Sequence, residues 1–181
     1  MKTICIVVGH SANKGGAYNN EKKLGEYDYN HVLAGLIAEK IHHQNVRPII
    51  MYRGDSYSGM VKDVNETSAD FAIELHCNGV KNKSVQGAET LFCHTSKPSR
   101  QLAERLQNAV QGVMKQNDRG LKPIEPNGRG WAFLRYTNMP SVILEPFFIS
   151  NTESLMLGLE RREQLAEAIA NALVEHVNKG V

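Results

Sequence analysis

The sequence predicts an α/β sandwich with a largely parallel sheet. Two features of the 181-residue chain support this fold class. Segments typical of strands alternate with segments typical of helices along the whole chain, as in folds built from β–α units. The strand-like segments are nearly continuous in apolar residues, as strands are when helices cover both faces of their sheet. The length corresponds to one domain that can bury a substantial core.

The predicted strands are short runs rich in β-branched and other apolar side chains, at residues 3–8, 48–53, 71–77, 88–94 and 141–147. Three segments have apolar side chains at the spacing of one helix face, and they span residues 26–43, 98–115 and 160–178. Ser150 and Glu153 have the spacing of a capping box, which predicts a further short helix. Residues 11–25 and 122–130 are expected to be surface loops near strand ends, where sites on α/β sheets usually form.

Charge, cysteine spacing and the length of apolar runs argue against several classes of protein. A formal net charge of +2 argues against nucleic-acid binding, which usually needs a concentrated basic patch. The three cysteines are far apart and lack CxxC spacing, which predicts reduced thiols. The first apolar run, residues 4–8, is shorter than the roughly 7–15 residues of a signal-peptide core. No segment reaches the ~20 apolar residues of a membrane span. We therefore expect synthesis in the cytoplasm, with no membrane insertion and no nucleic-acid partner.

Four polar residues lie where a site is expected. His10, His76 and Glu145 are at or near the carboxyl ends of three apolar strands, which meet at one edge of a parallel sheet. Glu26 opens the first predicted helix, and counting along the helix places it on the inward stripe with Leu33. Two imidazoles and a carboxylate make a three-ligand zinc site with a fourth position open for water, and Glu145 then remains as a base.

Each of these residues also has a purely structural interpretation. A histidine at a strand end is often a hydrogen-bonded core residue, and a glutamate at a helix start often interacts with the helix dipole. Glu145 is equally compatible with a salt-bridged strand end. The sequence separations of the three predicted ligands match no short zinc motif such as HExxH. The residues alone therefore leave both interpretations open.

Four segments, in order, carry a resemblance to a known family. They are VVGHSANKGGAYN, EYDYNHVLAGLIAEKI, ADFAIELHCN with QGAETLF, and LRYTNMPSVILEPFFISN. Together they resemble the zinc-dependent N-acetylmuramoyl-L-alanine amidases of the amidase_3 type, from about residue 3 to 175. The resemblance implies a three-layer sandwich with a mixed, mostly parallel sheet of about six strands, and one catalytic domain over residues 1–181.

The resemblance also implies roles for the four candidate residues. His10, Glu26 and His76 would hold Zn²⁺, and Glu145 would be the catalytic carboxylate. The expected reaction is hydrolysis, by a zinc-bound water, of the amide bond between N-acetylmuramic acid and L-alanine in peptidoglycan. Two alternatives stay open: a zinc metallopeptidase that cuts the stem peptide, and a non-catalytic cell-wall-binding domain. A compact chain without a signal peptide suits a phage endolysin that acts on the cell wall, and we expect a monomer.

The chain departs from the family pattern at Glu74, where a small residue is usual two positions before the second histidine. Residues 74 and 76 share a strand face, so Glu74 either orients a metal ligand or forms a structural ion pair. Cys77 is expected to point to the opposite face. Arg119 and Lys122 either line the substrate groove or are solvated loop charges. The other histidines are expected away from the site, with His94 and His176 at the surface; these are His31, His42, His43, His94 and His176.

Overall fold

A computed structural model describes residues 1–54 and 56–179 of the chain. It confirms the predicted α/β class and the mixed, mostly parallel sheet. Within these residues the sheet has six strands: β1 (Thr3–Val8), β4 (Arg47–Tyr52), β5 (Phe71–Leu75), β6 (Ala88–Cys93), β7 (Asp118–Ile124) and β8 (Ser141–Glu145). A separate hairpin pairs β2 (Tyr18–Asn19) with β3 (Leu24–Gly25). The last two residues of the predicted domain, 180 and 181, and position 55 lie outside the described residues.

The strand order is β4-β1-β5-β8-β6-β7. All neighbouring strands pair in parallel except β6 and β8, which are antiparallel. The carboxyl ends of β1, β5 and β8 therefore meet the amino-terminal ends of β6 and β7 at one edge of the sheet. This edge is where side chains that follow one set of strands can meet side chains that begin the other.

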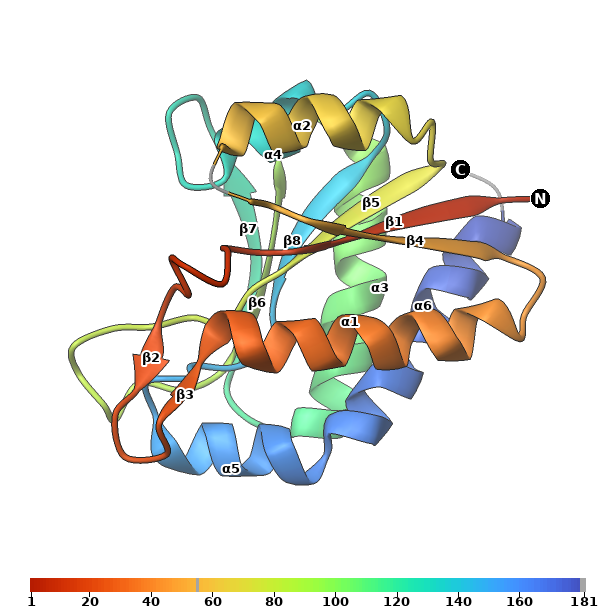
Figure 1. Ribbon diagram of the computed structural model, residues 1–181. Helices are drawn as coiled ribbons and strands as arrows, with labels where there is room; N and C mark the ends of the chain where they lie inside the picture. The colour runs from red at the N-terminus through yellow and green to blue at the C-terminus, as the bar shows by residue number, and fades with distance from the viewer. Residues whose placement is uncertain (55, 180–181) are drawn as a thin grey trace.

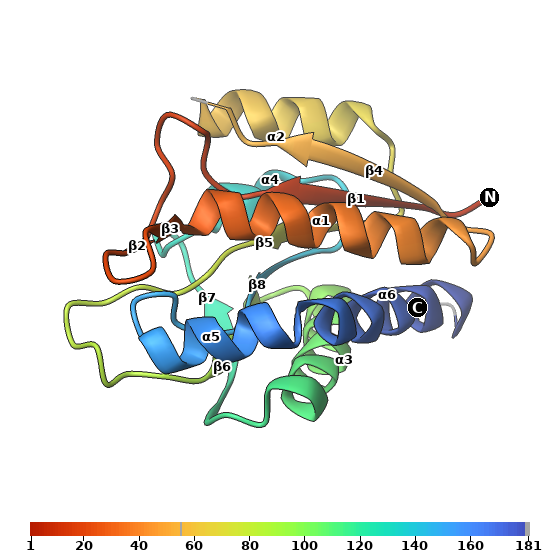
Figure 2. The ribbon, with the colours of Figure 1, turned by 60° about the horizontal axis from the view of Figure 1, so that its bottom comes forward.

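Helices cover both faces of the sheet. Figure 1 shows α2 (Tyr57–Glu66) and α4 (Trp131–Tyr136) on one face, with α1 (Glu26–His42), α5 (Thr152–Glu160) and α6 (Arg162–Lys179) on the other. The long helix α3 (Lys97–Met114) packs against α6 and against β6 and β8, on the same side as α1 (Figure 2). The core accordingly has two parts, one under α1, α3 and α6 and a smaller one under α2 and α4. None of the described helices is long and apolar enough to cross a membrane.

Most predicted elements are present with ends within about two residues, the usual uncertainty of such boundaries. Helix α1 buries the predicted stripe, which includes Glu26, Leu33 and Ile37. The capping-box prediction is wrong by one position, because Asn151 caps α5 and its side chain accepts a hydrogen bond from the backbone N–H of Ser154. Five of the described elements were missed: the edge strand β7, the helices α2 and α4, and the short strands β2 and β3, which lie within the predicted loop 11–25.

The prediction that His176 lies at the surface is also wrong. His176 is 4% exposed, and its ring packs edge-on against Phe71 with 4.7 Å between ring centroids. It follows Leu173 by three positions on α6, so it lies on the edge of the same buried stripe. Burial lowers its pKa. His94, by contrast, is exposed as predicted.

Candidate metal and catalytic site

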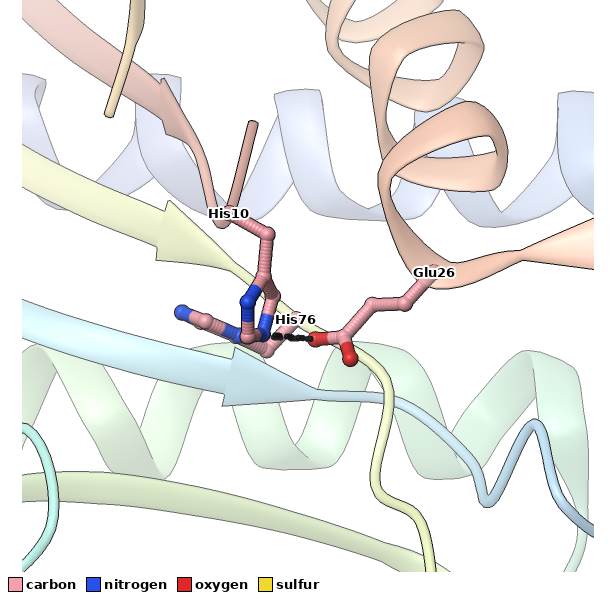
Figure 3. A group of neighbouring side chains, drawn as sticks. All are labelled: His10, Glu26 and His76. Carbon is pink, nitrogen blue, oxygen red and sulfur yellow. Dashed lines mark hydrogen bonds and ion pairs between the residues drawn. The ribbon is translucent and has the colours of Figure 1, made fainter. Parts of the chain in front are cut away.

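Three of the four predicted site residues converge at the edge of the sheet where β1 and β5 end. His10 lies two positions after the end of β1, His76 directly follows β5, and Glu26 is the first residue of α1. Their ligand atoms all lie within 4.8 Å of one another, and Figure 3 shows the side chains pointing toward a common centre. The fold thus brings together residues that are 16 and 50 positions apart in the chain.

Glu26 contacts both histidines and is held by the backbone. It is 3% exposed, and each of its carboxylate oxygens accepts a backbone hydrogen bond: Oε1 from Cys77 at 2.9 Å and Oε2 from Ala17 at 2.8 Å. Oε1 also lies 2.7 Å from Nδ1 of His76 and 3.3 Å from Nε2 of His10. Burial alone would raise the pKa of Glu26, but the hydrogen bonds from His10 and His76 outweigh it and lower the pKa to about 2. Glu26 is therefore an ionised carboxylate.

The backbone around these side chains leaves no room for larger residues. A Cβ on Gly9 would lie 2.5 Å from Cε1 and Nε2 of the His76 ring. A Cβ on Gly16 would lie 2.5 Å from Oε2 of Glu26, and Gly16 also has a φ of +79°, which favours glycine. His10 itself has a φ of 66°, an uncommon conformation for a residue with a side chain. Such strained positions are often found at functional sites, where the surrounding structure enforces them.

The donor set fits a zinc ion. With zinc–ligand distances of about 2.0–2.2 Å, the ligands of a tetrahedral site lie roughly 3.3 Å from each other. Nε2 of His10 lies at that distance, 3.3 Å, from Oε1 of Glu26, and Nδ1 of His76 is closer, at 2.7 Å. The three ligand atoms all lie within 4.8 Å of one another, and the two rings are nearly perpendicular, at 81°. Three nitrogen and oxygen donors leave a fourth tetrahedral position for water or substrate.

Glu74 contacts His76, as its shared strand face predicted. Oε1 of Glu74 lies 3.1 Å from Nε2 of His76, on the side of the ring opposite Glu26. Burial opposes protonation of His76, but the charges of Glu74 and Glu26 outweigh it and raise the pKa of His76 to about 10. The predicted contact is therefore present, and it is compatible with either role, orientation of a metal ligand or a structural ion pair.

Glu145, the fourth predicted residue, lines the same cavity, which has a volume of about 460 Å³. It is the last residue of β8 and is 6% exposed. Burial raises its pKa to about 7, against the opposing charge of Arg129, whose Nη1 lies 2.9 Å from Oε1 of Glu145. A carboxyl group with a pKa near neutrality can accept and return a proton, which suits a general base and acid.

A polar network beside Glu145 was not predicted. Glu89 on β6 pairs directly with Glu145 across the antiparallel ladder, so two buried carboxylates are neighbours. Arg129 pairs with Glu89 as well as with Glu145, and Nε of Arg119 donates to Oε2 of Glu89 at 2.7 Å. Asn78 donates to Oε1 of Glu89 at 2.8 Å. Because Arg129 belongs to the loop after β7, no strand pattern or local motif indicated it.

The remaining predictions about this edge have mixed outcomes. Cys77 does point away from the ligand centre, since its thiol approaches Oδ1 of Asn30 at 3.8 Å. Burial raises the pKa of the Cys77 thiol well above its ordinary value, so the thiol is not activated. Neither Arg119 nor Lys122 lines the cavity; Arg119 is held by Glu89, and Lys122 donates to the backbone carbonyl of Arg119 at 2.7 Å.

Comparison with known proteins agrees with this geometry. The family model described as N-acetylmuramoyl-L-alanine amidase matches residues 4–175. The chain belongs to the Amidase_3 family. The predicted family resemblance is thereby confirmed, and membership of this family supports a peptidoglycan amidase activity.

Known proteins match nearly the whole of this chain. The uncharacterized protein YqiI of Bacillus subtilis is 30% identical over 95% of the chain and 83% of its own length. The N-acetylmuramoyl-L-alanine amidase LytC of the same species is 27% identical over 97% of the chain, which spans only 35% of LytC. The crystal structure of an N-acetylmuramoyl-L-alanine amidase from Clostridium difficile 630 has a TM-score of 0.89, with 24% identity and coverage of 99% and 98% of the two chains. This structure shows the shared fold.

Proposed function

We propose that this protein is a zinc-dependent N-acetylmuramoyl-L-alanine amidase that hydrolyses the amide bond between N-acetylmuramic acid and L-alanine in peptidoglycan. The observation that carries the proposal is the meeting of His10, Glu26 and His76 in one cavity with a buried glutamate whose pKa is about 7. Membership of the Amidase_3 family supplies the substrate class.

In this proposal His10, Glu26 and His76 hold the ion. A zinc ion supplies a Lewis acid that polarises a carbonyl group and lowers the pKa of water. Glu145 accepts the proton of the attacking water on its carboxylate and then returns it to the departing amine of L-alanine. Arg129 holds the Glu145 carboxylate by the contact at 2.9 Å. Because Glu145 is almost fully buried at the end of β8, its carboxylate has little freedom to turn away from the cavity.

The proposal is tested by Glu145→Gln, which keeps the shape of the side chain and removes its ability to accept a proton. We expect the variant to bind zinc and to unfold like the wild type, while turnover on purified peptidoglycan falls by about 10²–10⁴-fold, the usual contribution of a general base. Glu125→Gln, an exposed change in the loop after β7, is the matched control. Ordinary turnover by Glu145→Gln would remove Glu145 from the mechanism.

Mass spectrometry of the digest separates the candidate reactions. An amidase releases whole stem peptides and leaves intact glycan strands, whereas a metallopeptidase leaves peptide fragments attached to the glycan. A wall-binding domain releases neither. Lysis of a host cell, as by a phage endolysin, and the monomeric state stay predictions.

A further inference from the structure

A buried carboxylate lies in the apolar layer beneath the candidate metal site. Glu74 is fully buried, with 0% exposure, at the penultimate position of β5. Its neighbours in the sheet are Val7 on β1 and Ile143 on β8, both apolar and buried. The alternation of strand faces directs Glu74, like Val7, toward the apolar layer under α2 and α4. A charged side chain is costly there unless its partners compensate for the lost water.

Glu74 has only two polar partners within reach in the described part of the chain. Its Oε2 accepts a hydrogen bond from the hydroxyl of Tyr57, the first residue of α2, at 3.1 Å. Its Oε1 is buried, lies 3.1 Å from Nε2 of His76 and accepts a hydrogen bond from no other described group. One carboxylate oxygen is thus anchored on α2, and the imidazole of His76 is the only described partner within reach of the other.

This arrangement fixes which nitrogen of His76 faces the candidate ligands. Nε2 is next to Glu74, and Nδ1 lies 2.7 Å from Oε1 of Glu26, in the centre formed with His10. A neutral imidazole has one N–H and one free lone pair, and a metal takes the lone pair. A carboxylate that accepts the N–H at Nε2 therefore leaves Nδ1 as the ligand atom, and such partners commonly fix the orientation of metal-binding histidines.

We propose that Glu74, anchored by Tyr57, is a positioning residue that holds the N–H of His76 at Nε2 and so directs Nδ1 to the metal. The inference rests on the proposed metal site, and it assigns a purpose to a buried charge that packing does not require. An apolar side chain at position 74 would suit the surrounding layer of Val7 and Ile143 better. We therefore expect Glu74 to act on the orientation of His76 rather than to stabilise the core.

The test compares zinc affinity and stability in the same set of variants. Glu74→Leu combined with Tyr57→Phe removes the carboxylate and the hydroxyl together, so that neither is left buried without a partner. Glu74→Gln keeps an acceptor oxygen without the charge, and Glu39→Gln, an exposed change on α1, is the matched control. Zinc affinity is measured by competition with a chromogenic chelator, and the free energy of unfolding of the metal-free protein is measured in urea.

We expect zinc to bind the double variant about 10–100-fold more weakly than the wild type, the usual effect of losing such a partner. Glu74→Gln should lie in between, and Glu39→Gln should match the wild type. The metal-free double variant should be at least as stable as the wild type, because a buried charge has been replaced by apolar packing. Lower stability with unchanged zinc affinity would identify a structural ion pair and overturn the proposal.

A spectroscopic measurement reports the orientation directly. In long-range ¹H–¹⁵N correlation spectra of the zinc-loaded wild type, His76 should carry its proton on Nε2 and bind zinc through Nδ1. Loss of this pattern in the double variant supports the proposal, whereas zinc bound at Nε2 in the wild type overturns it. A wild type that binds no zinc would refute the metal site of the proposed function, a failure distinct from unchanged affinity in the double variant.

Discussion

Replacement of Arg129 by glutamine is expected to shift the pH dependence of catalysis. Arg129 contacts Glu145 at 2.9 Å and is the first of the charges that oppose the effect of burial on the pKa of Glu145. It also pairs with Glu89, the cross-strand neighbour of Glu145. Arg129→Gln removes the positive charge and leaves the negative charge of Glu89 less compensated, so both effects raise the pKa of Glu145.

The size of the shift follows from the geometry. An opposite charge at this distance typically lowers a carboxyl pKa by about 1–3 units. Because the Arg129 side chain is 49% exposed, water screens its charge, and the expected effect is at the lower end, about 1 unit. The pKa of Glu145, about 7 in the wild type, would then be higher in the variant by about that amount. A bound cation lowers the pKa in both proteins, so the prediction concerns the difference between them.

The assay is the pH profile of kcat/KM on a soluble muropeptide from pH 5 to 10. Glu145 must be ionised to accept a proton, so activity rises with pH through its pKa, and this acidic limb should move upward by about 1 unit in the variant. Well below the acidic limb of the wild type the variant should be about tenfold slower, and well above the limbs of both proteins the two should be nearly equal. Arg119→Gln is the comparison variant: Arg119 contacts Glu89 but not Glu145, so its loss should move the acidic limb less than the loss of Arg129 does. An acidic limb at the same pH in wild type and Arg129→Gln would refute the argument that Arg129 tunes Glu145.

Two further predictions concern a close contact at Gly9 and a buried hydrogen bond at Tyr29. Gly9→Ala would place a Cβ 2.5 Å from the His76 ring. We therefore expect weaker zinc binding in chelator competition and a loss of about 1–3 kcal/mol in the free energy of unfolding in urea. Gly15→Ala, which has open space around it, should change neither quantity. Tyr29→Phe removes a buried hydrogen bond of 2.9 Å to the carbonyl of Gly158 and should cost about 1–2 kcal/mol in urea unfolding. The exposed Tyr52→Phe should cost less than about 0.5 kcal/mol, and equal losses for the two tyrosines would contradict the argument.

The sequence predicts the central strands well and the periphery poorly, for a physical reason. Strands β1 and β8 are buried on both faces, so they are continuous apolar runs that few other structures would explain. The missed strand β7 has the sequence DRGLKPI, with an exposed or partly exposed pattern and a proline, because it is at the edge of the sheet. Its pairing with β6 depends on a neighbour distant in the chain, which periodicity does not reveal.

In the candidate site too, residues on or next to the central elements can be predicted from the sequence, and residues on loops cannot. His10, His76 and Glu145 are predictable because the parallel strands that they follow bring their carboxyl ends to one edge. Glu26 is predictable as a carboxylate on the buried stripe of α1. Arg129, however, reaches the cavity from a loop. A loop without repeating pattern gives no indication of which of its charges turns inward.

The charges at this edge of the sheet support the proposed metal ion. Four buried carboxylates, each at most 6% exposed, lie here in two groups: Glu26 and Glu74 both contact His76, and Glu89 and Glu145 both contact Arg129. Two guanidinium groups, Arg119 and Arg129, pair with the second group. When all four carboxylates are ionised, the negative charges exceed these positive charges by two. Buried charges are stable only when they are compensated, and the compensation here can come from protons on the imidazoles of His10 and His76 or from one divalent cation between them. A divalent cation satisfies the balance while both histidines stay neutral, which is the form in which an imidazole binds a metal.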